Sequence, residues 1–230
     1  MISCIEIALK KELRDAEAFS LKKKADSYFG INIQEARCIN IVTIESDLDL
    51  HQLEAVKDEI LTNPVTQVSS LNPLDIGFHW CIWVGFRPGV KDNPGATAME
   101  AIQDYLGKNF GPDEGIYTSK RYCLKGNTLV REDVEKLASE LLSNTIIQQF
   151  KVFSIEEWDK DIGADVKPAK VILDHTPCFE VVSIESDEQL AKISDERNLA
   201  LNPRDIPVIR EYFLDSKVLE SRKKVGLSEP

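Results

Sequence analysis

FHWCIWVGFRPGVKDNPGATAMEAIQDYL, residues 78–106, passes from a strand pattern to a helix pattern across one short turn. Apolar side chains dominate Phe78–Phe86, which is typical of a buried strand. Residues Asn93–Leu106 instead place apolar side chains at helical spacing. The stretch therefore predicts a strand, a tight turn and an amphipathic helix.

The turn, FRPGVKDNPGA (residues 86–96), admits two interpretations. Asn93 is expected to cap the helix, with Pro94 at its first position, and Gly95 allows close backbone approach. A helix N-terminus attracts anions, so the turn is either a ligand or partner loop or only a well-made connection. The pattern favours the second, since it matches neither a P-loop nor a dinucleotide fingerprint. The candidate contact residues are Arg87, Lys91, Asp92, Asn93 and Gly95, with Lys120 and Arg121 on a later strand.

The same order of elements occurs twice along residues 1–154. The first half alternates strand and helix patterns as β-α-β-α-β, and so does the second. A shift of 77 residues aligns Ile5 with Ile82 and Gly30 with Gly107, and a shift of 81 aligns Asn63 with Asn144. The difference fits a longer central loop in the second half. Self-similarity of this kind indicates a duplicated unit, so we expect domains at 1–76 and 77–154.

One unit of this length buries little apolar surface by itself. The two are therefore expected to pack together as a pseudo-dimer, with the helices of each unit on one face of a small antiparallel sheet. The sequence leaves two arrangements open: helix layer against helix layer, or edge to edge in a continuous sheet.

Composition restricts the function classes. The chain carries 39 acidic and 28 basic residues, a net charge of −11, which disfavours nucleic acid or an anionic membrane as the partner. The five cysteines are widely spaced, without a C-x-x-C pair, and most fall in apolar strand patterns. We therefore expect the cysteines to be reduced and buried, in a cytoplasmic protein. No histidine has metal-ligand spacing to another candidate ligand.

Residues 155–230 are less regular, and we expect a linker. Val171–Leu173 and Phe179–Ile184 are short strand candidates. A helix is expected from Asn202, acting as its N-cap, through the apolar positions that follow. Pro207 conflicts with a helix interior, so the helix is expected to start late or to bend there.

A resemblance to a known family rests on three stretches of the second half. PGVKDNPGATAMEAIQDYLG, IYTSKRYCLKG and REDVEKLASELLSNTIIQQF resemble the PurS-type module as found fused to phosphoribosylformylglycinamidine synthase. The family's turn, Gly-Val-x-Asp-x-x-Gly, is matched by Gly89, Val90, Asp92 and Gly95. The first half looks like a degenerate copy that keeps Asp15 but lacks both glycines. LALNPRDIPVIREYF and the closing GLSEP resemble the linker that precedes the family's ligase domain.

The resemblance implies a non-catalytic role. The complete enzymes of the family convert formylglycinamide ribonucleotide to its amidine, using ATP, magnesium and ammonia made from glutamine. The PurS-type part bridges the ligase and glutaminase parts, and none of the family's catalytic or cofactor-binding residues falls within this chain. We therefore expect a cytoplasmic docking scaffold, inactive alone, whose partners are its own ligase domain and a glutaminase, with a homodimer as a further option. The alternatives are an effector-binding module at the pseudo-dimer interface and a purely structural pseudo-dimer.

Overall fold

A computed structural model describes residues 1–164, 166–171, 182 and 184–226 of the chain. The chain divides into two compact units, Met1–Ile172 and Leu173–Pro230. The fold class is α+β, with a six-stranded antiparallel sheet in the first unit and seven α-helices among the described residues.

The order β-α-β-α-β occurs twice in the first unit, and each half has a π-helical turn after its second helix. The first half contains β1 (Ile2–Leu9), α1 (Ala16–Phe29), β2 (Glu35–Glu45), α2 (Leu50–Ala55), η1 (Val56–Leu61) and β3 (Gln67–Ser70). The second contains β4 (Trp80–Phe86), α3 (Asn93–Leu106), β5 (Gly115–Lys125), α4 (Arg131–Leu137), η2 (Ala138–Leu142) and β6 (Gln148–Ser154).

The two halves join edge to edge, which settles the arrangement that the sequence left open. The strand order is β3-β1-β2-β5-β4-β6, and the central antiparallel pair β2–β5 belongs to both halves. A shift of 80 residues carries Glu35 onto Gly115 and Glu45 onto Lys125. Under that shift Asn40 maps onto Lys120, its own partner across the ladder. A local pseudo-two-fold axis therefore passes between Asn40 and Lys120, at the centre of the sheet.

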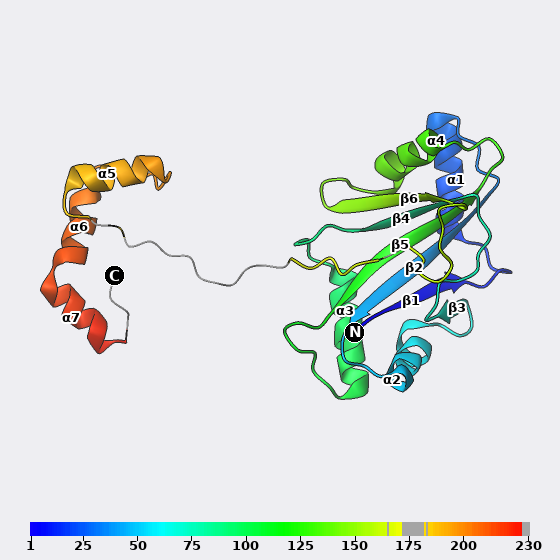
Figure 1. Cartoon of the computed structure of the whole chain (residues 1–230), viewed down its shortest axis with the longest axis horizontal. Helices are drawn as coiled ribbons and strands as arrows, with labels where there is room; N and C mark the ends of the chain where they lie inside the picture. The colour runs from blue at the N-terminus through cyan, green and yellow to red at the C-terminus, as the bar shows by residue number, and fades with distance from the viewer. Residues whose placement is uncertain (165, 172–181, 183, 227–230) are drawn as a thin grey trace. The chain divides into compact units, whose positions relative to one another are not determined.

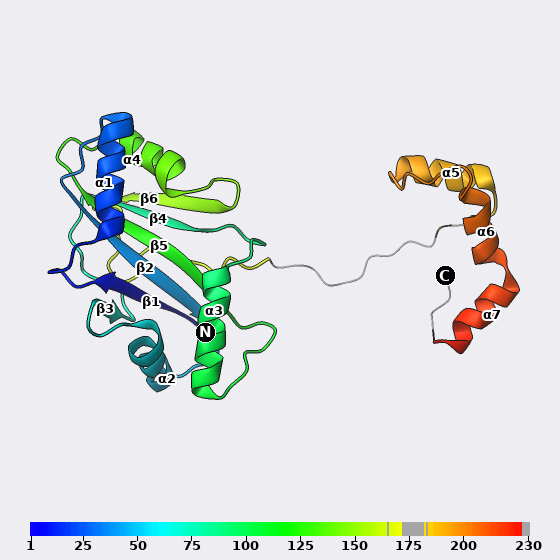
Figure 2. The same cartoon turned by 180° about the vertical axis from the view of Figure 1, so that it is seen from behind.

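The helices of the first unit lie on one face of the sheet, the face turned to the viewer in Figure 2. Two separate apolar clusters fill the space between helices and strands. One joins Leu21 and Ala25 of α1 to strands β4 and β5 and to α4. The other joins Ile102 of α3 to β1, β2 and α2.

Each cluster therefore mixes residues from both halves. The first helix of one half packs beside the second helical segment of the other: α1 contacts η2, and α3 contacts η1. Leu21, for example, belongs to the first half but packs with Val134 and Leu137 of the second. Neither half thus completes a core from its own residues.

Connecting segments, not helices, cover the opposite face, which Figure 1 shows. The third apolar cluster gathers Ile39, Trp83 and Cys123 from the strands, together with Phe78 and Ala164 from the segments before β4 and after β6. Trp158 lies edge-on to the rings of Phe78 and Phe153 at centroid distances of 5.3 and 5.7 Å. Trp158, Ala164 and Val166, which follow β6, accordingly pack on the sheet of the first unit.

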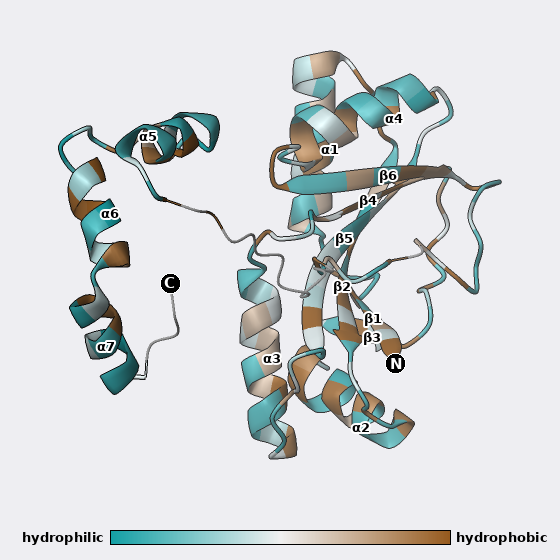
Figure 3. Cartoon of the chain, turned by 60° about the vertical axis from the view of Figure 1, so that its left-hand side comes forward, coloured by the Kyte–Doolittle hydropathy of each residue, from teal (hydrophilic) through white to brown (hydrophobic). Residues whose placement is uncertain are grey.

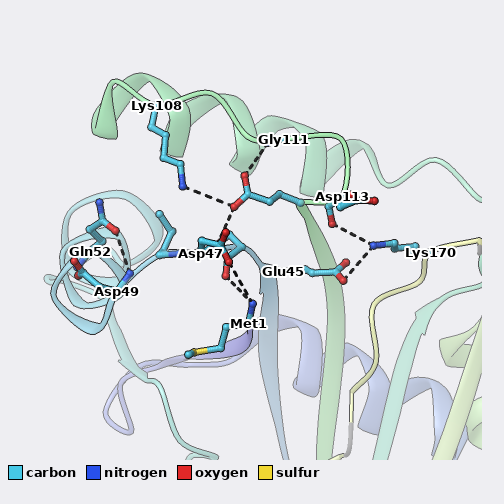
Figure 4. Close-up of polar contacts among 12 residues, drawn as sticks. Met1, Glu45, Asp47, Asp49, Gln52, Lys108, Gly111, Asp113 and Lys170 are labelled. Carbon is cyan, nitrogen blue, oxygen red and sulfur yellow. Dashed lines mark hydrogen bonds and ion pairs between the residues drawn. The ribbon is translucent and has the colours of Figure 1, made fainter.

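The loop between α3 and β5 is tied to the first half at one end of the sheet (Figure 4). The Glu114 carboxylate accepts hydrogen bonds from the Gly111 amide at 2.7 Å and from the Asp47 amide at 2.9 Å. Lys170 pairs with Glu45 at 3.2 Å and donates to the Asp113 carbonyl at 3.1 Å. The longer central loop of the second half is thus held in place by polar contacts.

Among its described residues the second unit contains three short helices, α5 (Asp187–Glu196), α6 (Ile206–Leu214) and α7 (Ser216–Lys224). Asp187 of α5 and Arg210 of α6 form an ion pair at 3.0 Å. Figure 3 shows α7 as largely hydrophilic, and its last turn is basic.

The expectation that Asn202 caps a helix is wrong. Asn202 accepts the amide of Arg204 in a turn, and α6 begins at Ile206. The late start places Pro207 in the first helical turn, where a proline loses no intrahelical hydrogen bond. Most of each predicted strand, Phe179–Ile184 and Val171–Leu173, lies outside the described residues.

Candidate functional site

Asp92, not Asn93, caps α3, so the predicted cap was one residue off. One Asp92 oxygen accepts the Gly95 amide at 2.7 Å, and the other accepts the Thr118 amide of β5. The Thr118 hydroxyl donates to the same carboxylate at 2.9 Å. A single side chain therefore caps the helix and fixes it to the neighbouring strand.

Asp15 does the same in the first half. It accepts the Ala18 amide at 2.9 Å as the cap of α1 and the Cys38 amide of β2 at 2.8 Å. The first half lacks both glycines of the turn but keeps this aspartate. In both copies the aspartate thus caps the first helix and fixes it to the neighbouring strand.

Gly95 is required by close packing. A β-carbon at this position would lie 2.5 Å from the Ile116 carbonyl oxygen and 2.9 Å from the Asp92 carboxyl carbon. The close approach predicted from the sequence is therefore made by β5, not by a ligand.

Arg87, Lys91 and Asn93 are exposed. The Arg87 guanidinium donates to the Thr145 and Gln148 carbonyls at 3.0 and 3.1 Å and so holds the turn that enters β6. The Asn93 carbonyl accepts from Thr97 inside α3. Arg87, Asp92, Asn93 and Gly95 thus make contacts within the fold itself.

Lys120 and Arg121 point to opposite faces of the sheet, as the strand alternation predicts. Arg121 is fully buried on the face without helices, so it is not exposed as the partner or ligand contact considered from the sequence. It pairs with Glu6 and donates to the Leu74 carbonyl at 3.0 Å, and its guanidinium lies 4.7 Å from the Trp158 ring. Arg121 thus links strands and connecting segments of both halves.

Lys120 lies on the helical face, next to the pseudo-two-fold axis. Its ammonium is 2.7 Å from each carboxylate oxygen of Glu17 on α1, and the Tyr122 hydroxyl donates to Glu17 at 2.7 Å. Burial by itself would raise the pKa of Glu17, but the hydrogen bonds from Lys120 and Tyr122 outweigh it and lower that pKa. Burial and the Glu17 hydrogen bond raise the pKa of Tyr122.

A groove of about 460 Å³ opens on the helical face beside this ion pair. Its floor crosses the centre of the sheet from β4 to β2, and it separates the two helix clusters, whose helices α1 and α3 lie apart in Figure 2. The lining residues are Asn40, Ile41, Val42, Val84, Gly85, Phe86, Pro94, Thr118, Ser119, Lys120, Tyr122, Leu142 and Gln148. We take this surface, the central groove, as the candidate site.

Of the seven residues predicted from the sequence, the central groove includes Lys120 alone. Sequence reasoning missed Asn40, Gln148 and Glu17. Asn40 offered a usable signal, because it interrupts an apolar strand in phase with the buried Cys38 and Val42. A polar residue on the apolar face of a strand indicates that no helix covers the sheet at that position.

Two matching turns present exposed aliphatic side chains. The side-chain oxygen of Asn63 accepts a hydrogen bond from the Val65 amide, and the backbone amide of Asn63 donates to the side-chain oxygen of Gln67. Asn144, Ile146 and Gln148 repeat these contacts before β6. Val65 is 77% exposed and Ile146 83%, so both turns offer an apolar tip to solvent.

Within the described part of the chain, no three His, Cys, Asp or Glu side chains are placed to hold a metal ion, and no helix is both long and apolar enough to cross a membrane. No family model matches the chain, and no curated protein is significantly similar to it.

Proposed function

We propose that this chain is the non-catalytic N-terminal scaffold of a phosphoribosylformylglycinamidine synthase: two PurS-type modules in tandem, then the linker to the ligase domain. The proposal starts from the resemblance of residues 88–107, 116–126 and 131–150 to the module. The doubled β-α-β-α-β order and its pseudo-two-fold sheet support it. In this proposal the chain is cytoplasmic.

The observation that carries a docking role is the interlocked core. Because α1 packs on the second half and α3 on the first, residues 1–154 form one interlocked body and not two jointed modules. A rigid bridge can hold two separate active sites in a fixed orientation, as ammonia transfer between them requires. The apolar tips Val65 and Ile146 are the contacts we assign to the ligase or glutaminase partners.

The chemistry belongs, in this proposal, to the parts that follow. ATP activates the amide oxygen of the substrate, and ammonia displaces the phosphate, with magnesium neutralising the nucleotide charge. The described residues do not group as a metal site, and no step of the reaction is assigned to them.

Calorimetry with separately expressed ligase and glutaminase parts tests the docking role. Saturable heat is expected with the native chain, and Ile146→Asp should weaken binding about tenfold or more, because it places a charge in an apolar contact. Thr145→Asp adds the same charge one residue earlier and serves as the control. Absence of binding to both parts, or amidine formation by the chain alone, contradicts the proposal.

A second function is favoured by one specific feature, the central groove. Its volume lies within the range of small-ligand sites, and it lies at the junction of the two halves. An effector bound there would contact both halves at once. Calorimetry against nucleotides and amino acids distinguishes this function from docking.

A further inference from the structure

The central groove contains hydrogen-bond donors that the fold leaves unused. Asn40 is exposed in the middle of β2, and its side chain makes no hydrogen bond to any described residue. Gln148 uses its carbonyl oxygen to accept the Asn144 amide, which leaves its NH₂ group without a partner in the described structure. Lys120 gives two hydrogen bonds to Glu17 and keeps a third N–H.

These donors surround an apolar floor. Val42, Val84, Phe86 and Leu142 line the same groove. Asn40 and Lys120 lie directly opposite each other across the ladder, so their β-carbons are within about 5.5 Å. Donors outnumber free acceptors, because the carboxylates of Glu17 and Asp92 are already occupied by hydrogen bonds.

We infer that the central groove binds a small organic anion with an apolar body, such as an aromatic or aliphatic carboxylate or sulfonate. Lys120 and the amides of Asn40 and Gln148 would hold the anionic group, since charge-assisted hydrogen bonds are the strong ones. The aliphatic and aromatic floor would bury the body. The inference gives a ligand class to the second function proposed above, and it is independent of docking through Val65 and Ile146.

Two fluorescent probes of nearly equal shape test the inference. Anilinonaphthalene sulfonate carries one anionic group, and phenyl-naphthylamine is its neutral counterpart. The native chain should bind one sulfonate molecule saturably, about tenfold or more tightly than the neutral probe. Equal affinity for the two probes, or no saturable binding of the sulfonate, overturns the inference.

Substitutions locate the site. Asn40→Phe should abolish sulfonate binding, because it fills the groove from an exposed position where no hydrogen bond is lost. Lys120→Met should remove the preference for the sulfonate. Lys125→Met is the matched control: it lies on the same strand, is 39% exposed against 42% for Lys120, and pairs with Glu35 at 2.7 Å.

The variants also separate the groove from other apolar surfaces. Sulfonate binding that survives both Asn40→Phe and Lys120→Met lies elsewhere on the chain and overturns the inference. Ile146→Asp, which tests docking, is expected to leave sulfonate binding within about twofold, so the two proposals can fail separately.

Discussion

Gly95 lies where the fold leaves no room for a side chain. A methyl group there would collide with the Ile116 carbonyl and the Asp92 side chain, at 2.5 and 2.9 Å. Gly95→Ala should lower the free energy of unfolding by about 1–3 kcal/mol, the usual cost of overpacking. Urea unfolding of residues 1–171 measures it. Gly77→Ala, whose nearest neighbour would be a lysine side chain at 3.7 Å, should stay within about 0.5 kcal/mol.

Glu17 makes stability depend on pH. Its folded pKa is lowered by Lys120 and Tyr122, so its contribution is present above the unfolded value of about 4.3 and is lost as pH falls through the folded pKa. The difference in unfolding free energy between native protein and Glu17→Gln should therefore shrink between about pH 5 and pH 3. Glu100→Gln, on the exposed side of α3, provides the baseline. A pH-independent difference for Glu17→Gln contradicts the assignment.

At the scale of elements, the exchange of α1 and α3 between the halves decides how the chain folds. Residues 1–76 and 77–171 expressed separately should each fail to unfold cooperatively, because each exposes the strands that the other's helix covers. Mixed together, they should recover the native circular dichroism and a cooperative transition. Either half folding stably alone would contradict this.

The same exchange explains how far prediction from sequence could go. Strands, helices and their order followed from the local pattern, since periodicity and caps act over a few residues. The partner of each helix did not, because Leu21 packs with Val134 and Leu137, more than a hundred residues away along the chain. Likewise the sequence located the turn at Asp92 and favoured a structural connection there, but it could not identify Thr118 as the partner of the aspartate.

At the scale of the whole molecule, Arg121 and Glu6 join the two halves beneath the covered face. Arg121→Met should cost about 3–5 kcal/mol, because it leaves a buried carboxylate without its partner. The double variant Arg121→Met with Glu6→Leu should cost less than the sum of the single changes, which a double-mutant cycle measures. Lys125→Met removes a surface ion pair and should cost at most about 1 kcal/mol. A loss below 1 kcal/mol for Arg121→Met would contradict a central role for the pair.

By itself the sequence determined the α+β class, the doubled β-α-β-α-β order and the turn that places an aspartate before each first helix, because these depend on neighbours in the chain. Only the tertiary structure decided that the halves share one sheet, that Arg121 is buried while Lys120 faces a groove, and that Asn40 lies beside the pseudo-two-fold axis. The physical reason is that strand pairing and helix placement depend on which apolar surfaces cover one another across the whole molecule. The central groove is the part of the sheet that neither helix cluster covers.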